Sequence, residues 1–238
     1  MNASSDKDKD KKIITEITTV PVPFPLEKIE ENITITSNSE YQLSKEKLIK
    51  QAFKFHSQGN ISRAKQYYLS FINQGYLDHR VFSNYGTILR SFGKLKEAEV
   101  LYRKAIEISP NFVEAYYNLG LTLKDLGELK DAELSTRKAI ELNPNSSNTY
   151  LNLGIILRDL GNLKDAELST RKAIELNPNS SNAYLNLGAT LRDLGNLKDA
   201  ELFTRKAIEL NPNFEMAYSN LGNILIDLGN LKDAELFT

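Results

Sequence analysis

The stretch "NPNSSNAYLNLGATLRDLGNLKDAELFTRKAIELNPN", Asn177 to Asn213, begins and ends with the same three letters and decides the fold. Its two prolines, Pro178 and Pro212, are thirty-four residues apart. The thirty-four residues 147–180 and the thirty-four residues 181–214 are identical at twenty-nine positions. A period of this length indicates a repeat architecture, in which each unit packs against its neighbours.

Each unit is predicted to be two helices joined by a turn, as residues 147–180 illustrate. Ser147 is expected to cap a first helix whose apolar residues recur at three- and four-residue steps. Gly161 ends that helix, because glycine tolerates the positive φ of a C-terminal cap. Asn177 and Pro178 end the second helix, because proline disfavours helical geometry in the residue before it. The chain is therefore predicted to be all-α, a stack of antiparallel helix pairs.

The two faces of each helix pair differ in composition. Gly154 on the first helix and Ala166 and Ala173 on the second leave room for close approach of neighbouring backbones. Glu167 and Arg171 stand four residues apart on the other side of the second helix, where opposite charges can pair. We expect the small residues to be buried and the charged ones to form a solvated outer face.

These residues, an aromatic followed by Leu-Gly and then Gly, two Ala and Pro at a thirty-four-residue step, resemble the tetratricopeptide repeat, or TPR. Full repeats are expected at 79–112, 113–146, 147–180 and 181–214, with a degenerate repeat at 45–78 and a truncated one at 215–238. The resemblance implies a right-handed solenoid. It also implies that the first helices line a concave groove, generally used to bind an extended peptide or a partner helix.

The chain departs from the TPR pattern on its second helices. The aromatic residue that the family has before the second small residue is kept as Tyr68 and Tyr102. It is replaced by Thr136, Thr170 and Thr204 in the later repeats. Because threonine fills less volume than tyrosine, we expect looser packing around these three positions.

Residues 1–44 precede the repeats and lack a helical period. They combine an alternating "DKDKDKK" with a proline-spaced "PVPFP" and contain too few apolar residues for a core. We expect a disordered linker that acts as a spacer. In the alternative, the prolines hold an extended conformation that displays Val22 and Phe24 to a partner groove.

One asparagine per repeat falls on the predicted first helix, and we call this row the asparagine ladder. A carboxamide has two N–H donors and an acceptor oxygen, so such a row can pair with the backbone of an extended peptide. The ladder is similar to the one in the TPR half of O-linked N-acetylglucosamine transferases, where it holds substrate protein. The alternative, hydrogen bonds within the solenoid or to water, stays open. The ladder residues are Asn84, Asn118, Asn152, Asn186 and Asn220.

Apolar and basic residues flank the ladder, and they suggest a groove for an extended segment with apolar and acidic side chains. The alternative for the basic residues is a favourable interaction with a helix C-terminus, with neighbouring aspartates offsetting their charge, and we prefer it. A carboxylate clamp is not expected, because Ser83, Tyr117 and Leu151 stand where such clamps need lysine. The side chains expected to face the groove are Tyr117, Leu121, Leu151, Ile155 and Leu185. The groove-edge residues are Arg90, Lys124, Arg158 and Arg192.

Composition excludes several classes of function. The chain has 30 Lys and Arg against 31 Asp and Glu, so no basic excess favours nucleic acid or an anionic membrane. It has no cysteine and only two histidines, His56 and His79. We therefore expect no enzyme activity, no metal and no cofactor within these residues, and we expect His56 at the surface. No signal peptide or membrane span is evident, which favours a cytoplasmic protein.

We therefore predict a scaffold that binds a protein or peptide. The alternative is the N-terminal, substrate-recruiting part of a larger transferase, similar to a glycosyltransferase or sulfotransferase, with its catalytic domain outside these residues. The last repeat is shorter than the period, so we expect Leu221, Leu225 and Leu228 to be left partly uncovered. Exposed apolar surface of this kind marks an interface or a missing neighbour. We expect a fragment of a longer array, or self-association through the C-terminal end.

Overall fold

The computed structural model describes residues 43–234, and within this range the chain forms twelve α-helices and no strand. The prediction of an all-α stack of helix pairs is confirmed. Residues 1–42 of the expected linker lie outside the described range. In the part of the chain that the structure describes, no helix is long and apolar enough to cross a membrane.

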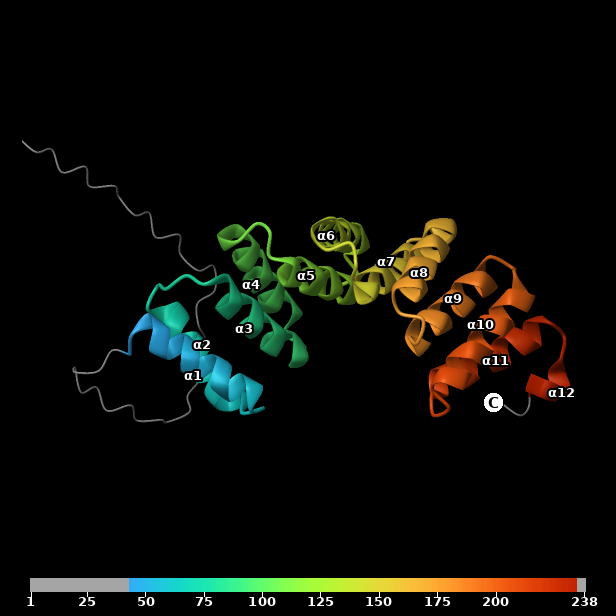
Figure 1. Cartoon of the computed structure of the whole chain (residues 1–238), viewed down its shortest axis with the longest axis horizontal. Coiled ribbons are helices and arrows are strands. Elements are labelled where there is room, and N and C mark those ends of the chain that lie inside the picture. Colours follow the sequence, from blue (N-terminus) through green and yellow to red (C-terminus); the bar gives the residue numbers. More distant parts are fainter. Residues whose placement is uncertain (1–42, 235–238) are drawn as a thin grey trace, which may run out of the picture. The chain divides into compact units, whose positions relative to one another are not determined.

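The helices follow one another along the stack in chain order (Figure 1). The first helices of the pairs are α1 (Lys45–Ser57), α3 (His79–Ser91), α5 (Val113–Asp125), α7 (Ser147–Asp159), α9 (Ser181–Asp193) and α11 (Glu215–Asp227). The second helices are α2 (Ile61–Asn73), α4 (Leu95–Ile108), α6 (Leu129–Leu142), α8 (Leu163–Leu176), α10 (Leu197–Leu210) and α12 (Leu231–Ala234).

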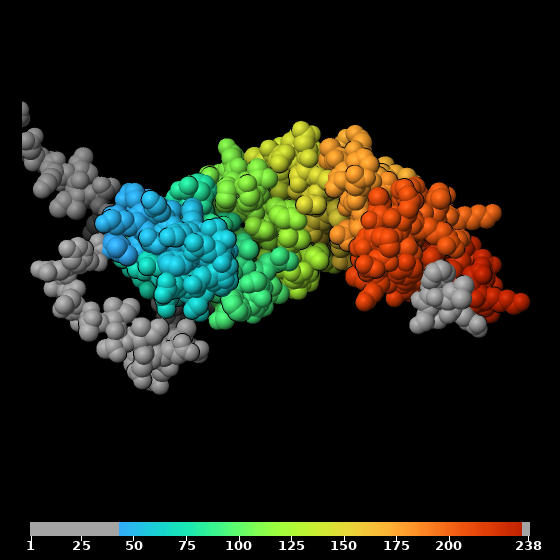
Figure 2. Space-filling view, turned by 60° about the horizontal axis from the view of Figure 1, so that its bottom comes forward, coloured from blue at the N-terminus to red at the C-terminus, as the bar shows by residue number. Residues whose placement is uncertain are grey.

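Contacts between helices define an inner and an outer side of the stack. Each first helix packs mainly against the second helix of its own pair, and each second helix also packs against the next first helix. From α3 onward, the first helices of successive repeats also contact each other, whereas the second helices do so much less. The first helices therefore lie on the inner side and the second helices on the outer side. Figure 2 shows that the side chains of consecutive repeats form a continuous packed body.

The N-terminus of α7 is held by two serine hydroxyls. Ser146 caps the helix, since its hydroxyl oxygen accepts from the Thr149 backbone N–H at 3.4 Å. Ser147 is the cap that the sequence predicts, and this prediction is wrong by one residue. The Ser147 hydroxyl donates instead to the Ala173 carbonyl oxygen at 2.8 Å, which links the start of α7 to the last turn of α8.

Small residues allow α7 and α8 to approach closely, as predicted. Ala166 and Ala173 have no exposed surface. Gly161 follows α7 with φ of 81°, a left-handed conformation that favours glycine. A Cβ atom at Gly154 would lie 2.3 Å from the Thr170 hydroxyl oxygen, so any side chain there would force its neighbours to move.

The threonines that replace the family's aromatic residue are fully buried. Thr136, Thr170 and Thr204 have no exposed surface, although each is much smaller than the tyrosine it replaces. Each of the three hydroxyls accepts a hydrogen bond from an asparagine of the next repeat.

Candidate peptide-binding face

Three asparagines of the ladder form hydrogen bonds across repeat boundaries. In each case the amide nitrogen of a first helix donates to a threonine hydroxyl oxygen on the second helix of the preceding repeat. These amides hold neighbouring repeats together. The three bonds join Asn152 Nδ2 to Thr136 Oγ1 at 3.2 Å, Asn186 Nδ2 to Thr170 Oγ1 at 2.8 Å and Asn220 Nδ2 to Thr204 Oγ1 at 3.1 Å.

Thr170 serves two neighbours at once. The Thr170 hydroxyl donates to the Ala166 carbonyl oxygen at 2.8 Å and accepts from Asn186. It also lies directly over Gly154 of its own repeat. A buried amide N–H needs such an acceptor, because leaving it unpaired costs free energy. Glycine, threonine and asparagine therefore act as one packing unit at the repeat boundary.

Burial removes two of these amides from contact with a ligand. The Asn152 side chain is 3% exposed and that of Asn186 is 6% exposed. The Asn152 carbonyl oxygen Oδ1 is buried and has no hydrogen-bond partner within residues 43–234. A peptide in the groove could reach this oxygen only if the side chain moved. The geometry supports hydrogen bonding within the solenoid as the role of these two amides.

Asn84 lies in a different setting near the N-terminal end. Its side chain hydrogen-bonds the hydroxyl of Tyr68, whose ring is fully buried. Burial raises the pKa of Tyr68 to about 12, and the bond with Asn84 only partly opposes this. The Tyr68 hydroxyl also lies 2.9 Å from His56 Nδ1. The expectation that His56 is a surface residue is wrong, because its side chain is half-buried and burial lowers its pKa.

Asn118 on α5 is the ladder residue whose amide has no partner among residues 43–234. Its side chain is half-buried and forms no hydrogen bond with any other described residue. Its neighbours Tyr117 and Leu121 are also half-buried, in contrast to Leu119 and Leu123 on the same helix, which are core residues. The amide of Asn118 is thus available at the surface of the inner helix.

The other apolar residues predicted for the groove have the same partial exposure. Leu151 and Ile155 on α7 and Leu185 on α9 are half-buried, as are Tyr117 and Leu121 on α5. These helices contact each other on the inner side of the stack. The structure therefore places all five side chains on three adjacent first helices, where they are partly open to solvent.

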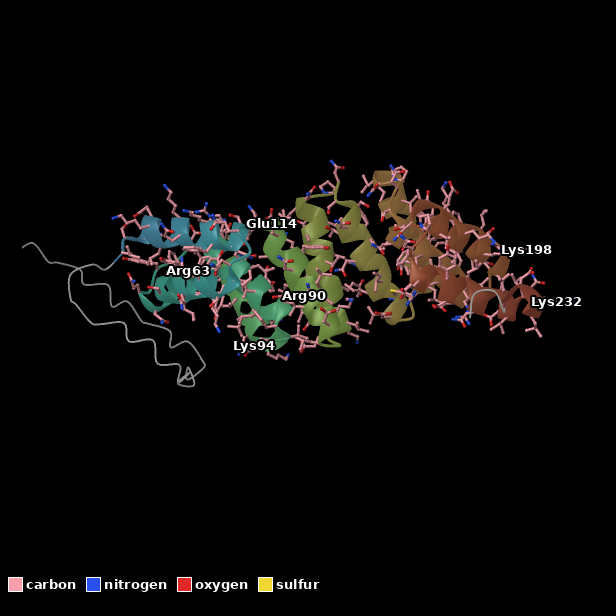
Figure 3. All side chains as sticks on the ribbon, turned by 90° about the horizontal axis from the view of Figure 1, so that it is seen from below. Arg63, Arg90, Lys94, Glu114, Lys198 and Lys232 are labelled. Atoms are coloured by element: carbon pink, nitrogen blue, oxygen red, sulfur yellow. The ribbon has the colours of Figure 1, made fainter. Side chains whose placement is uncertain are left out.

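The basic residues at the groove edge form ion pairs along the stack. Each of three arginines bonds to an aspartate at the end of the next first helix, thirty-five residues later. The pairs are Arg90 with Asp125 at 2.6 Å, Arg158 with Asp193 at 3.7 Å and Arg192 with Asp227 at 2.5 Å. The aspartates thus offset the basic charge, although the partner belongs to the next repeat and is not the adjacent residue. Arg90 is labelled in Figure 3.

Lys124 interrupts this row of ion pairs. Its ammonium nitrogen lies 3.3 Å from the adjacent Asp125 instead of reaching the next repeat. Asp159, the partner that the pattern assigns to it, has no ion pair among residues 43–234. Burial tends to raise the pKa of the Asp125 carboxyl. The hydrogen bond and charge of Arg90, with the charge of Lys124, outweigh burial and hold that pKa below its ordinary value.

A shallow hollow of about 250 Å³ lies between α10 and α11. The equivalent space one repeat earlier holds Phe203, which stacks on Tyr184 and lies under the Arg171 guanidinium. The residue thirty-four positions after Phe203 is Phe237, which lies outside the described residues. The hollow is lined by Arg205, Ile208, Glu209, Tyr218 and Leu221.

The pairing of asparagine with threonine was not predicted, although the sequence contains a signal for it. Each of the three threonines precedes a ladder asparagine by sixteen residues. This spacing is shorter than one repeat, so it crosses from a second helix to the next first helix. Among residues 43–234, no cluster of three or more His, Asp or Glu side chains could hold a metal ion.

Models of the TPR family match most of the helical part of the chain. One described as "TPR repeat" matches residues 86–127. Two described as "Tetratricopeptide repeat" match residues 113–146, 147–180 and 181–214, and residues 203–235. Among curated protein sequences, none matches the chain significantly.

Solved structures of TPR proteins are similar to this chain. A crystal structure of MamA is 28% identical with a TM-score of 0.59, covering 68% of this chain and 91% of that one. The structure of YrrB, described as "a TPR protein with an unusual peptide-binding site", is 25% identical with a TM-score of 0.58, covering 71% and 88%. A tetratricopeptide repeat protein from Parabacteroides merdae is 23% identical with a TM-score of 0.71, covering 81% and 77%, and shows the fold alone. The period, the helix pairs and these matches together establish that the chain belongs to the tetratricopeptide repeat family.

Proposed function

We propose that the chain is a protein-interaction scaffold that binds an extended peptide along the inner face of α5, α7 and α9. The observation that carries the proposal is the free carboxamide of Asn118 beside the half-buried Tyr117 and Leu121. One carboxamide can donate to a peptide carbonyl oxygen and accept from a peptide N–H at the same time. Asn118 thus supplies the polar contact that fixes the peptide backbone.

The other residues of this face determine which peptide side chains can bind there. Leu151, Ile155 and Leu185 are half-buried and offer apolar surface on the two following first helices. The arginines at the edge are already paired with aspartates, so they leave little net charge to attract an acidic peptide. The occupant that fits is an extended segment with apolar side chains. YrrB, a structural relative described as having a peptide-binding site, supports this use of the fold.

The proposal is tested with peptides selected on the purified full chain from a phage-displayed random library. Dissociation constants of the selected peptides are then compared for the wild type and for Asn118→Ala. One lost hydrogen bond of about 0.5–1.5 kcal/mol weakens binding roughly 2- to 12-fold. Leu121→Glu on the next turn of α5 is expected to abolish binding by placing a charge on the apolar surface.

Asn186→Ala is the matched control at the same repeat position. Its amide is buried and bonded to Thr170, so its loss is expected to lower stability and leave peptide affinity unchanged. Circular dichroism confirms that each variant is folded at the assay temperature. Selected peptides that bind Asn118→Ala and Leu121→Glu as tightly as wild type would place the binding site elsewhere.

A further inference from the structure

Three leucines on the outer helices are strongly exposed. Leu134, Leu168 and Leu202 are 67%, 66% and 62% exposed, and they occupy the same position of α6, α8 and α10. On α8, the residues two positions to either side, Ala166 and Thr170, have no exposed surface. Leu168 therefore points away from the stack, and its two counterparts do the same in the neighbouring repeats.

A carboxylate precedes each of these leucines by three residues. Asp165 on α8 is exposed and has no ion pair with any residue that the structure describes. Asp131 and Asp199 stand at the same position of α6 and α10 and are also exposed and unpaired in the described range. Figure 3 shows Lys198, the neighbour of Asp199, at the edge of the stack. The first turn of each of α6, α8 and α10 thus carries a carboxylate beside its leucine that has no ion pair in the described range.

An arginine follows each leucine by three residues. Arg171 is 44% exposed and bonds to Glu167 on its own helix at 2.8 Å. Its guanidinium also lies over the Phe203 ring, but it has five N–H donors, so others stay available. Arg137 and Arg205 stand at the same position of α6 and α10 and form the same bond within their helices. Each of α6, α8 and α10 therefore presents the pattern Asp-x-x-Leu-x-x-Arg.

This pattern is complementary to itself. Residues three positions apart lie on one side of a helix, so Asp165, Leu168 and Arg171 share one face. If a second copy of α8 packs antiparallel across a two-fold axis at Leu168, the two leucines meet. Asp165 then faces Arg171 of the second copy, and Arg171 faces Asp165 of that copy. A two-fold interface has this property, because one surface patch contacts an identical patch.

We propose that the outer face of α6, α8 and α10 is an interface between two copies of this chain. Leu168 lies on the two-fold axis, and Leu134 of one copy faces Leu202 of the other. A different partner would have to supply both charges in the mirrored order, which a second copy supplies by symmetry. The inner face with Asn118 stays accessible, so the interface is compatible with peptide binding.

The arrangement of the outer helices sets the strength of the contact. The second helices contact each other less than the first helices do, so they diverge on the outer side of the stack. The central pair of α8 helices therefore packs tightest and the flanking pairs contribute less. Interfaces below about 1,200 Å² of total buried area are weak or transient. We expect a dimer that dissociates on dilution.

Sedimentation equilibrium of the full chain at low salt measures this association. The wild type is expected to show a monomer–dimer equilibrium, and Leu168→Glu to remove the dimer. Leu134→Glu and Leu202→Glu are expected to weaken it equally, since the two positions face each other, and less than Leu168→Glu does. Leu231→Glu is the control, because Leu231 is 62% exposed on α12 and lies outside the pattern.

A charge exchange tests the two-fold register. Asp165→Arg places two arginines opposite each other in a homodimer, and Arg171→Asp places two aspartates opposite each other. Each variant alone is expected to be monomeric, whereas an equimolar mixture restores dimers with both ion pairs. This recovery also shows that both variants are folded.

Three results would overturn the proposal. The first is a wild-type chain that stays monomeric up to about 1 mM. The second is a dimer that persists in Leu168→Glu or is lost in Leu231→Glu. The third is a mixture of the two charge variants that stays monomeric although circular dichroism shows both to be folded.

Discussion

Asn186 on α9 donates its amide N–H to the hydroxyl oxygen of Thr170 on α8 across 2.8 Å, and both side chains are buried. The bond joins two repeats at a point where the TPR pattern has an aromatic ring. It replaces apolar contact by a buried polar pair, which stabilises the boundary only while both partners are present. The ladder thus has a structural part at Asn152, Asn186 and Asn220 and an available amide at Asn118.

Thr170→Val tests the structural part of the ladder. Valine has nearly the same shape but no acceptor, so the Asn186 amide is left buried and unpaired. We expect the free energy of unfolding, measured by urea denaturation, to be about 1–3 kcal/mol lower than in the wild type. Thr122→Val is the control, because the buried Thr122 hydroxyl donates only to the backbone carbonyl oxygen of Asn118 within α5. Equal losses of stability in Thr170→Val and Thr122→Val would show that the bond from Asn186 adds no stability of its own.

Gly154→Ala tests how tightly α7 and α8 pack. The new Cβ atom would lie 2.3 Å from Thr170 Oγ1 and 3.2 Å from the Ala166 carbonyl oxygen, so the helices must separate. We expect a loss of roughly 1–3 kcal/mol, although alanine favours helices over glycine. Removing the hydroxyl in Gly154→Ala/Thr170→Ala should cost less than the sum of the single changes. Strictly additive losses in a thermal denaturation series would contradict this contact.

Lys124→Arg is expected to complete the row of ion pairs along the inner edge. Its longer guanidinium can reach Asp159, which has no ion pair within the described residues, as Arg90 reaches Asp125. Surface pairs contribute little, so we expect a gain of about 0.2–1 kcal/mol at low ionic strength. The gain should disappear in high salt, whereas Lys130→Arg on the exposed face of α6 should have no effect. A gain that is independent of salt would point to packing instead of charge.

His56 gives the fold a pH dependence near neutrality. Burial lowers its pKa in the folded chain below the ordinary value of 6.5. The unfolded chain therefore binds the proton first as the pH falls, and stability decreases from about pH 6.5 down to the folded pKa. Above the pKa that His56 has in the unfolded chain, the imidazole is neutral in both states and this loss of stability is absent. Urea midpoints between about pH 7.5 and about pH 5.5 should fall in the wild type and change less in His56→Gln, and an equal fall in both would contradict this role.

The repeat period made the fold predictable, because Gly154, Ala166 and Ala173 mark the close contacts by their size alone. The contacts between repeats were harder to predict from the sequence. Whether Arg158 pairs with the adjacent Asp159 or with Asp193 of the next repeat depends on how two helices are offset, which the period does not specify. The burial of Asn152 likewise depends on the position of Thr136 across the boundary.

The outer leucines were missed for a different reason. Leu168 follows the buried Ala166 by two residues, a spacing that places it on the opposite side of a helix, yet leucine is usually assigned to a core. The same three letters of the pattern, Asp, Leu and Arg, repeat in α6, α8 and α10. Attention to apolar residues off the core face would have identified this surface.

The central claim is that a peptide contacts the free amide of Asn118, and the side-chain amide signals in a ¹H–¹⁵N correlation spectrum test it most directly. The Asn118 signals are assigned as those missing from Asn118→Ala, and a selected peptide is titrated into the wild type. We predict that the Asn118 amide signals shift in proportion to the bound fraction while those of Asn186 stay in place. Saturating peptide that leaves the Asn118 signals unchanged, or that shifts only residues of the outer helices, would contradict the account.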